Sequence, residues 1–155
     1  MTVSIDKSKV ISPGPNGDWP VVSLNLEYKY SLKQVEEYRY LGIDICPSPR
    51  ITFKNHGEKL IKKTARFKGS IHSLSKYGPD RTDMATCLWN NVACSGILYG
   101  TEAIILTEGC LNELESAQAS FAKGVLGVRQ STSNMGAIAE MGFKTMRHRL
   151  YEQKI

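Results

Sequence analysis

Four basic side chains give the sequence its clearest candidate for chemistry: Lys59, Lys62, Lys63 and Arg66. If this segment is a helix, they cluster on one flank of it, since helical positions turn by about 100° per residue. Clustered ammonium and guanidinium groups bind phosphate oxygens, which gives affinity for nucleic acid without sequence choice. The net charge of +5 also favours a polyanionic partner. The alternative interpretation is a solvated helix face without a ligand.

Other residues that could carry out a reaction are scattered along the chain. The three histidines, His56, His72 and His148, lie far apart in the sequence. No Asp-Asp pair exists to hold two metal ions, and Asp80 and Asp83 suit the start of a helix better. Glycine-rich phosphate loops, nucleophile elbows and His-Glu-x-x-His motifs are also missing. The sequence therefore predicts no catalytic residue, no metal site and no cofactor in this chain.

Composition limits the compartment. The four cysteines form no Cys-x-x-Cys pair and are typical of small core residues, with a structural disulfide as the weaker alternative. The first residues show no secretory signal pattern, and no apolar run is long enough to cross a bilayer. We therefore expect an intracellular protein, in the cytoplasm or nucleus, without a membrane partner.

The basic flank requires a helix, which the pattern predicts from about residue 54 to residue 77. Its apolar stripe repeats at spacings of four and three residues and consists of Leu60, Thr64, Phe67, Ile71 and Leu74. Gly78 is expected to close this helix in the left-handed conformation, and Pro79 to prevent its continuation.

Further helices are predicted downstream. One begins at Asp80 or Thr82 and ends near residue 98 or 100, and another is capped by Thr107 and ended by Gly127. A short helix covers residues 135–141. The last segment is basic and stops at Ile155 without a helix-stop signal, so we expect the chain to be a piece of a longer protein.

The residues before Pro49 have β character. Residues 21–30 alternate between apolar and polar, and Glu37–Ile45 is expected to form one strand that Gly42 interrupts. We expect three or four antiparallel strands, with a hairpin of Leu24–Tyr28 and Tyr38–Ile43. The predicted fold class is α+β, with a small antiparallel β-sheet or hairpin at the N-terminus followed by a helical bundle of four to five helices.

Several short motifs carry a resemblance to a known family. The stretch Tyr38-Arg39-Tyr40-Leu41-Gly42 resembles the aromatic-basic-Tyr-Leu-Gly motif that follows the palm in reverse transcriptases of non-LTR (LINE-type) retrotransposons. Further segments resemble this family in the same order and at approximately the same spacing: Ser4–Val10, Leu98–Glu102, Leu114–Gln118, Leu126–Arg129 and Glu140–Phe143.

The resemblance implies a C-terminal fragment of an RNA-directed DNA polymerase. Residues 1–48 would be the end-of-palm strands and a primer-grip-like hairpin, residues 49–130 a thumb-like helical bundle, and residues 131–155 a truncated following helical segment. The catalytic aspartates of the family lie upstream, in fingers and palm that are not among these residues. Mg²⁺ is therefore expected only in the complete polymerase, and we expect no polymerase activity from the isolated chain.

The resemblance also implies binding roles. The basic helix flank would lie along the backbone of a template-primer duplex or RNA–DNA hybrid, and the missing fingers and palm would be protein partners. Tyr38 and Arg39 would approach the primer strand, although Tyr38 and Tyr40 equally suit half-buried sheet positions. Lys7 or Lys9 would match the palm lysine that protonates the leaving pyrophosphate, although an exposed edge-strand lysine is the stronger interpretation.

Two other classes of function stay open. The chain could be a basic nucleic-acid-binding or protein-interaction module derived from a retrotransposon, or a non-functional remnant. Salt-dependent binding to a duplex favours a nucleic-acid role, whereas a stable oligomer that binds no duplex favours an interaction domain.

Overall fold

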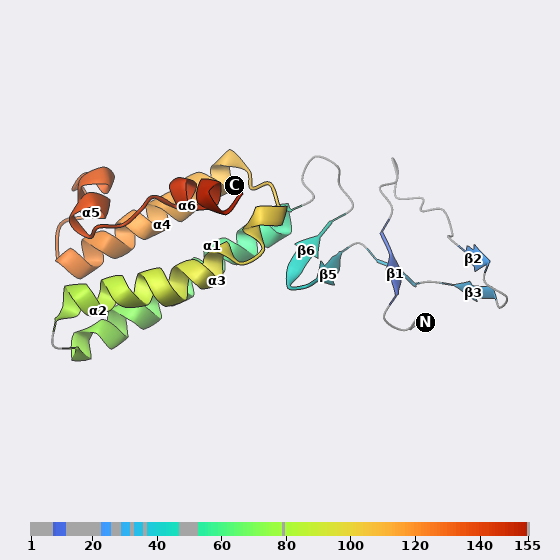
Figure 1. Ribbon diagram of the computed structural model, residues 1–155, viewed down its shortest axis with the longest axis horizontal. Coiled ribbons are helices and arrows are strands. Elements are labelled where there is room, and N and C mark those ends of the chain that lie inside the picture. The colour runs from blue at the N-terminus through green and yellow to red at the C-terminus, as the bar shows by residue number, and fades with distance from the viewer. Residues whose placement is uncertain are drawn as a thin grey trace. The chain divides into compact units, whose positions relative to one another are not determined.

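The computed structural model describes residues 8–11, 23–25, 29–31, 33–35, 37–46, 53–78 and 80–154. The chain divides into two compact units, Met1–His56 and Gly57–Ile155. Short strand pairs precede a set of α-helices, which confirms the α+β fold class (Figure 1). The division predicted at residues 48 and 130 concerns a parent polymerase and stays a prediction.

The described strands form three separate two-stranded sheets. β1 (Lys9–Val10) runs parallel to β4 (Lys33–Gln34), and β2 (Ser23–Asn25) runs antiparallel to β3 (Lys29–Ser31). β5 (Tyr38–Tyr40) and β6 (Ile43–Ile45) form the third, antiparallel pair. The predicted single sheet of three or four strands is therefore wrong for the residues that the structure describes.

The predicted pairing of Leu24–Tyr28 with Tyr38–Ile43 is also wrong. Leu24 pairs with Tyr30, and Tyr38 pairs with Ile45. Each hairpin instead closes with residues that are near in the sequence, which costs less loop-closure entropy than a distant pairing.

A tight turn replaces the single strand predicted over Glu37–Ile45. Leu41 and Gly42 have φ angles of 48° and 86°. Positive φ at both central positions is the property of a type I′ turn, whose twist suits a two-residue β-hairpin. Gly42 is thus a turn residue and not an interruption of a strand.

The first helix has the predicted extent. α1 (Lys54–Leu74) continues into the 3₁₀ turn η2 (Ser75–Tyr77). Leu60, Thr64 and Ile71 of the predicted stripe are buried, but Leu74 is 54% exposed, so its assignment to the stripe is wrong. Gly78 has φ −83° and ψ 160°, which is extended rather than left-handed, because the 3₁₀ turn ends the helix instead.

The second predicted helix is confirmed as three consecutive segments. α2 (Arg81–Leu88) is followed by the π-helical η3 (Trp89–Cys94) and by α3 (Ser95–Leu98). The Asp80 carboxylate accepts hydrogen bonds from the backbone N–H groups of Thr82 and Asp83 at 2.8 and 3.1 Å, as a helix N-cap does. α1 and this second helix lie side by side as a helical hairpin (Figure 1).

The later helices also have side-chain caps. After the 3₁₀ turn η4 (Thr101–Ala103), α4 (Glu108–Leu126) begins at Thr107 and ends at Gly127, which has φ 70°. α5 (Asn134–Glu140) is capped by Ser133, and α6 (Met146–Gln153) by Thr145.

The described core lies within the helices and the loop between α5 and α6. Trp89 and Phe121 are fully buried and stack with ring centroids 4.3 Å apart. Phe143 stacks on both, at 6.1 and 6.2 Å. Among the described helices, none is both long enough and apolar enough to cross a membrane.

Candidate nucleic-acid interface

The four predicted basic residues of α1 all lie at the surface. Lys59, Lys62, Lys63 and Arg66 are exposed. The centre of the four positions lies more than a quarter-turn around α1 from that of the buried Leu60, Thr64 and Ile71, at about 100° per residue. We call these four residues the α1 basic face. The structure therefore keeps all four together on one helix, where they are accessible to a ligand.

Lys63 stands at the edge of this face that adjoins α3. Its Nζ donates a hydrogen bond of 2.6 Å to the carbonyl oxygen of Gly96 and lies 5.9 Å from the ring centroid of Phe67. A Cβ at Gly96 would lie 2.8 Å from Phe67 Cζ, so glycine allows the two helices to approach closely here. One ammonium proton of Lys63 is therefore used within the protein, which leaves two for a ligand.

Lys62 and Arg66 are the most available members of the face. Neither forms an ion pair with another residue that the structure describes. Exposed cations without a carboxylate partner keep their full charge for a phosphate, apart from screening by salt.

The other predicted site residues belong to the unit Met1–His56. Arg39 is exposed and Tyr38 half-buried, both on β5, and Lys9 is exposed on β1. Lys7 lies outside the described residues. These residues therefore belong to a different compact unit from the α1 basic face.

A buried pair that sequence reasoning missed links β6 to the start of α1. Asp44 and His56 are 3% and 6% exposed, and Asp44 Oδ2 lies 3.6 Å from His56 Nδ1. The backbone N–H of Asp44 also donates to Nδ1 at 3.4 Å. Residues twelve positions apart give no periodic signal, so the sequence alone could not show this contact.

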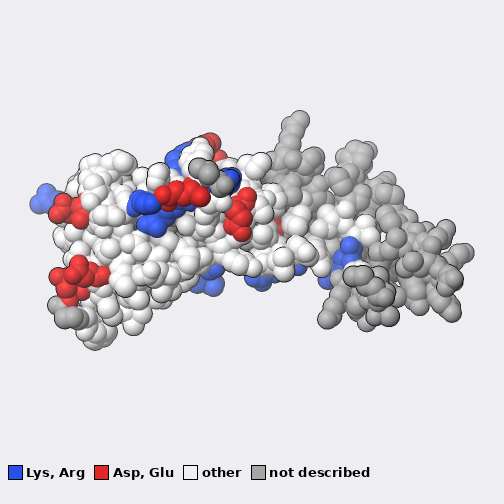
Figure 2. Space-filling model, viewed as in Figure 1, with Lys and Arg blue, Asp and Glu red and all other residues white. Residues whose placement is uncertain are grey.

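Basic residues of α6 are held by partners within the protein. Arg147 Nη2 donates to Glu108 Oε2 at 2.7 Å and to Asn112 Oδ1 at 2.8 Å. The hydrogen bond from Arg147 lowers the pKa of Glu108. Arg149 Nη2 donates to Asn90 Oδ1 at 2.6 Å. Basic and acidic side chains accordingly lie next to one another on this side of the helical unit (Figure 2).

Lys123 is a further cation that is not available to a ligand. It is only 5% exposed, and its Nζ donates to the Gln130 carbonyl at 2.8 Å and to Asn134 Oδ1 at 2.6 Å. The ammonium therefore holds the loop between α4 and α5, a role that sequence reasoning did not anticipate.

The cysteines divide by exposure. Cys94 and Cys110 are buried, as predicted, and burial raises the pKa of both thiols. Cys87 is exposed, so its assignment to the core is wrong. A raised pKa keeps a thiol protonated and unreactive, which does not suit a nucleophile.

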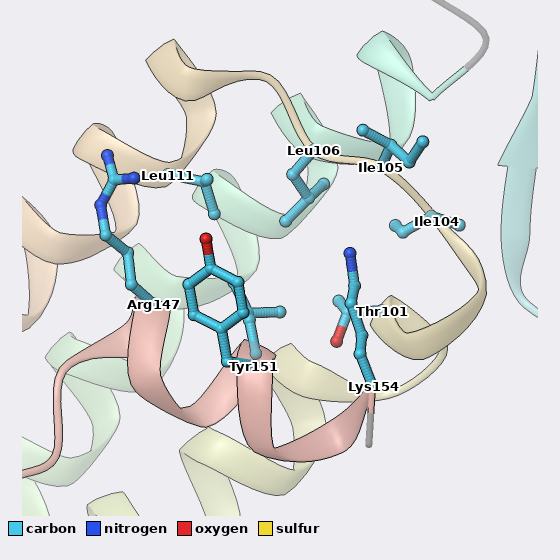
Figure 3. Close-up of a pocket in the computed structure, with 9 residues that line it drawn as sticks. Thr101, Ile104, Ile105, Leu106, Leu111, Arg147, Tyr151 and Lys154 are labelled. Carbon is cyan, nitrogen blue, oxygen red and sulfur yellow. The ribbon is translucent and has the colours of Figure 1, made fainter.

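A small pocket of about 100 Å³ lies between η4, α4 and α6. Its walls include Ile104, Leu106 and Leu111, and Tyr151 of α6 and Lys154, the residue after α6, reach across it (Figure 3). Such a space could accept one apolar group, but it contains no nucleophile paired with a base.

Within the described ranges, no three residues among His, Cys, Asp and Glu are grouped as they would be to hold a metal ion. No family model, curated protein or solved structure matches this chain.

Proposed function

We propose that this chain binds the backbone of a template-primer duplex or RNA–DNA hybrid through the α1 basic face. In this proposal it is the thumb-side fragment of a non-LTR reverse transcriptase, and the fingers and palm of the parent polymerase supply the catalytic aspartates and Mg²⁺. The exposure of Lys59, Lys62, Lys63 and Arg66 on one helix is the observation that carries the proposal.

The physical reason is counterion release. Each phosphate that a lysine or arginine neutralises releases condensed cations, so affinity falls as salt rises, by about 0.9 in logarithmic slope per contact on B-form DNA. A helix that presents several cations without reading base edges gives affinity and register but no sequence choice. This is the behaviour that a thumb closing on any duplex requires.

A filter-binding titration with an RNA–DNA hybrid at rising salt tests the proposal. We expect the double variant Lys62→Gln/Arg66→Gln to reduce the salt slope by about 1.8, because two phosphate contacts are lost. Both residues are exposed, so the variant should keep the fold of the wild-type chain. Circular dichroism checks this.

The matched control is Arg129→Gln/Lys154→Gln, which removes the same two residue types from exposed positions outside α1. It should change the salt slope by much less than the α1 variant. Equal loss in both variants would show that net charge alone causes binding. An unchanged slope in the α1 variant would refute the basic face as the contact surface.

The same titration separates the alternatives. If binding depends on the α1 basic face but the chain assembles with no polymerase partner, the result favours a basic nucleic-acid-binding module. No duplex binding, with a stable oligomer in sedimentation, would favour an interaction module. Neither binding nor association would be expected of a non-functional remnant.

A further inference from the structure

A second group of basic residues lies where α1, α2 and α4 meet. Lys68, His72 and Lys76 follow one another at intervals of four residues, so they lie along one side of α1 and its 3₁₀ extension. Arg81 is the first residue of α2. We call these four residues the His72 cluster. At about 100° per residue, its α1 members lie on a different side of the helix from the α1 basic face.

Short contacts fix the cluster against α4. Arg81 Nη2 donates to the Gly124 carbonyl at 2.9 Å and lies 3.4 and 3.5 Å from the two ring nitrogens of His72. Lys68 Nζ donates to Ser120 Oγ at 2.7 Å. Three of the four side chains are therefore half-buried at a junction of helices, and Lys76 is exposed beside them.

The cluster holds positive charge without a negative partner. None of its members forms an ion pair with any residue that the structure describes. The neighbouring Asp80 carboxylate accepts from the backbone of Thr82 and Asp83. Arg81 Nε is buried and has no hydrogen-bond partner among the described atoms. Even partial desolvation of an arginine or lysine without a counter-charge costs free energy.

The pKa of the His72 imidazole responds to the surrounding positive charge. Burial lowers the pKa of His72, and Arg81, Lys76 and Lys68 lower it further through their charges. A negative group placed among these cations would reverse the effect of the charges.

We propose that the His72 cluster is an anion-binding site for a phosphate group. Guanidinium and ammonium donors from two helices suit a tetrahedral oxyanion, which accepts several charge-assisted hydrogen bonds at once. The ligand is either free inorganic phosphate or a phosphate carried by a larger molecule such as nucleic acid. The inference goes beyond the proposed function, since it uses other residues and needs no duplex.

The test follows the imidazole signals of the full-length chain by NMR during a pH titration. In chloride, His72 should titrate below its ordinary value of 6.5. Inorganic phosphate at the same ionic strength should raise its pKa towards that value. Sulfate, which does not titrate in this range, should do the same. His148 lies beside Glu152 on α6 and provides a reference imidazole signal outside the His72 cluster.

Two variants identify the donors. Arg81→Gln should weaken phosphate binding about tenfold, as the loss of a charge-assisted hydrogen bond does. Because Arg81 also holds Gly124, Lys76→Gln provides an exposed substitution that leaves the helix contacts intact, and it should weaken binding severalfold. Lys154→Gln removes an equal charge elsewhere and should have no effect.

A further titration, with the RNA–DNA hybrid in chloride, identifies the source of the phosphate. A rise in the pKa of His72 with both ligands assigns the site to a nucleic-acid phosphate as well as to the free anion. A rise with inorganic phosphate alone assigns it to the free anion. If neither phosphate nor sulfate moves His72 relative to chloride, the site does not exist, whatever the result of the filter-binding experiment.

Discussion

Phe121 shows how much of the helical unit depends on single side chains. It is 1% exposed and stacks on two other aromatic rings, those of Trp89 and Phe143, which also stack on each other. Each ring comes from a different part of the sequence, so the stack ties the second helix and the loop before α6 to α4. Offset stacking adds about 0.5–1.5 kcal/mol to the burial of each pair.

We expect Phe121→Ala to lower the free energy of unfolding by about 3–5 kcal/mol, since it removes a buried ring and leaves a cavity. Urea denaturation followed by circular dichroism measures this. The control is Tyr77→Ala, because Tyr77 is 89% exposed and its loss should change the stability by less than about 0.5 kcal/mol. Similar losses in the two variants would contradict the structural role of the stack.

At the same scale, the sequence predicted the surface positions of some basic residues but not the contacts of others. The positions of Lys62 and Arg66 follow from helical periodicity, which fixes their separation from the apolar stripe before any fold is known. The burial of Lys123 and the contact of Arg81 with His72 depend on which helices meet, and no local pattern encodes that. The sequence therefore did not predict the His72 cluster, because its four residues come together only when the helices pack.

At the scale of elements, the turn between β5 and β6 shows the clearest conflict between residue type and backbone conformation. Leu41 has φ 48°, a left-handed conformation in which Cβ crowds the backbone of any L-residue. Asn tolerates this region, and Asn-Gly is the pair that a type I′ turn prefers. The chain thus carries Leu-Gly where its backbone geometry favours Asn-Gly.

Leu41→Asn should therefore stabilise the β5–β6 hairpin, by about 1 kcal/mol. Because Leu41 is 70% exposed, little packing is lost. Amide hydrogen exchange of residues 38–45 measures the effect, and protection should increase. Leu41→Val is the opposing control, since a β-branched residue suits positive φ least. Equal protection in the wild type and the Asn variant would show that Leu41 is not strained.

Helices and strands were not equally predictable. Caps at Asp80 and Thr107, and the stop at Gly127, are local signals, and each lies where the sequence placed it. The strand pairs were predicted wrongly because alternation of apolar and polar residues indicates a strand but not its partner. The role of Gly42 was predicted wrongly because a glycine in a strand-like sequence is equally compatible with a bulge and with a turn. The prediction of a left-handed conformation at Gly78 was wrong because the 3₁₀ turn Ser75–Tyr77 ends the helix before this residue.

At the scale of the whole molecule, the described hydrophobic core is concentrated in one of the two compact units. Every buried member of the core cluster lies between Ile71 and Leu150. The α1 basic face and the His72 cluster are also on helices of that unit. Both proposed binding surfaces are therefore made of residues from the unit that contains the described core.

We expect a shortened chain that begins at residue 53 to fold independently, because it keeps all of α1 and the complete core cluster. Its thermal unfolding, followed by circular dichroism, should be a single cooperative transition with the helical signal of the full chain. The same shortened chain with Phe121→Ala should lose most of that transition, which shows that the signal reports the packed core. A gradual, non-cooperative melt of the unsubstituted shortened chain would mean that residues before 53 complete the core, and the strands would then have to be included in any account of binding.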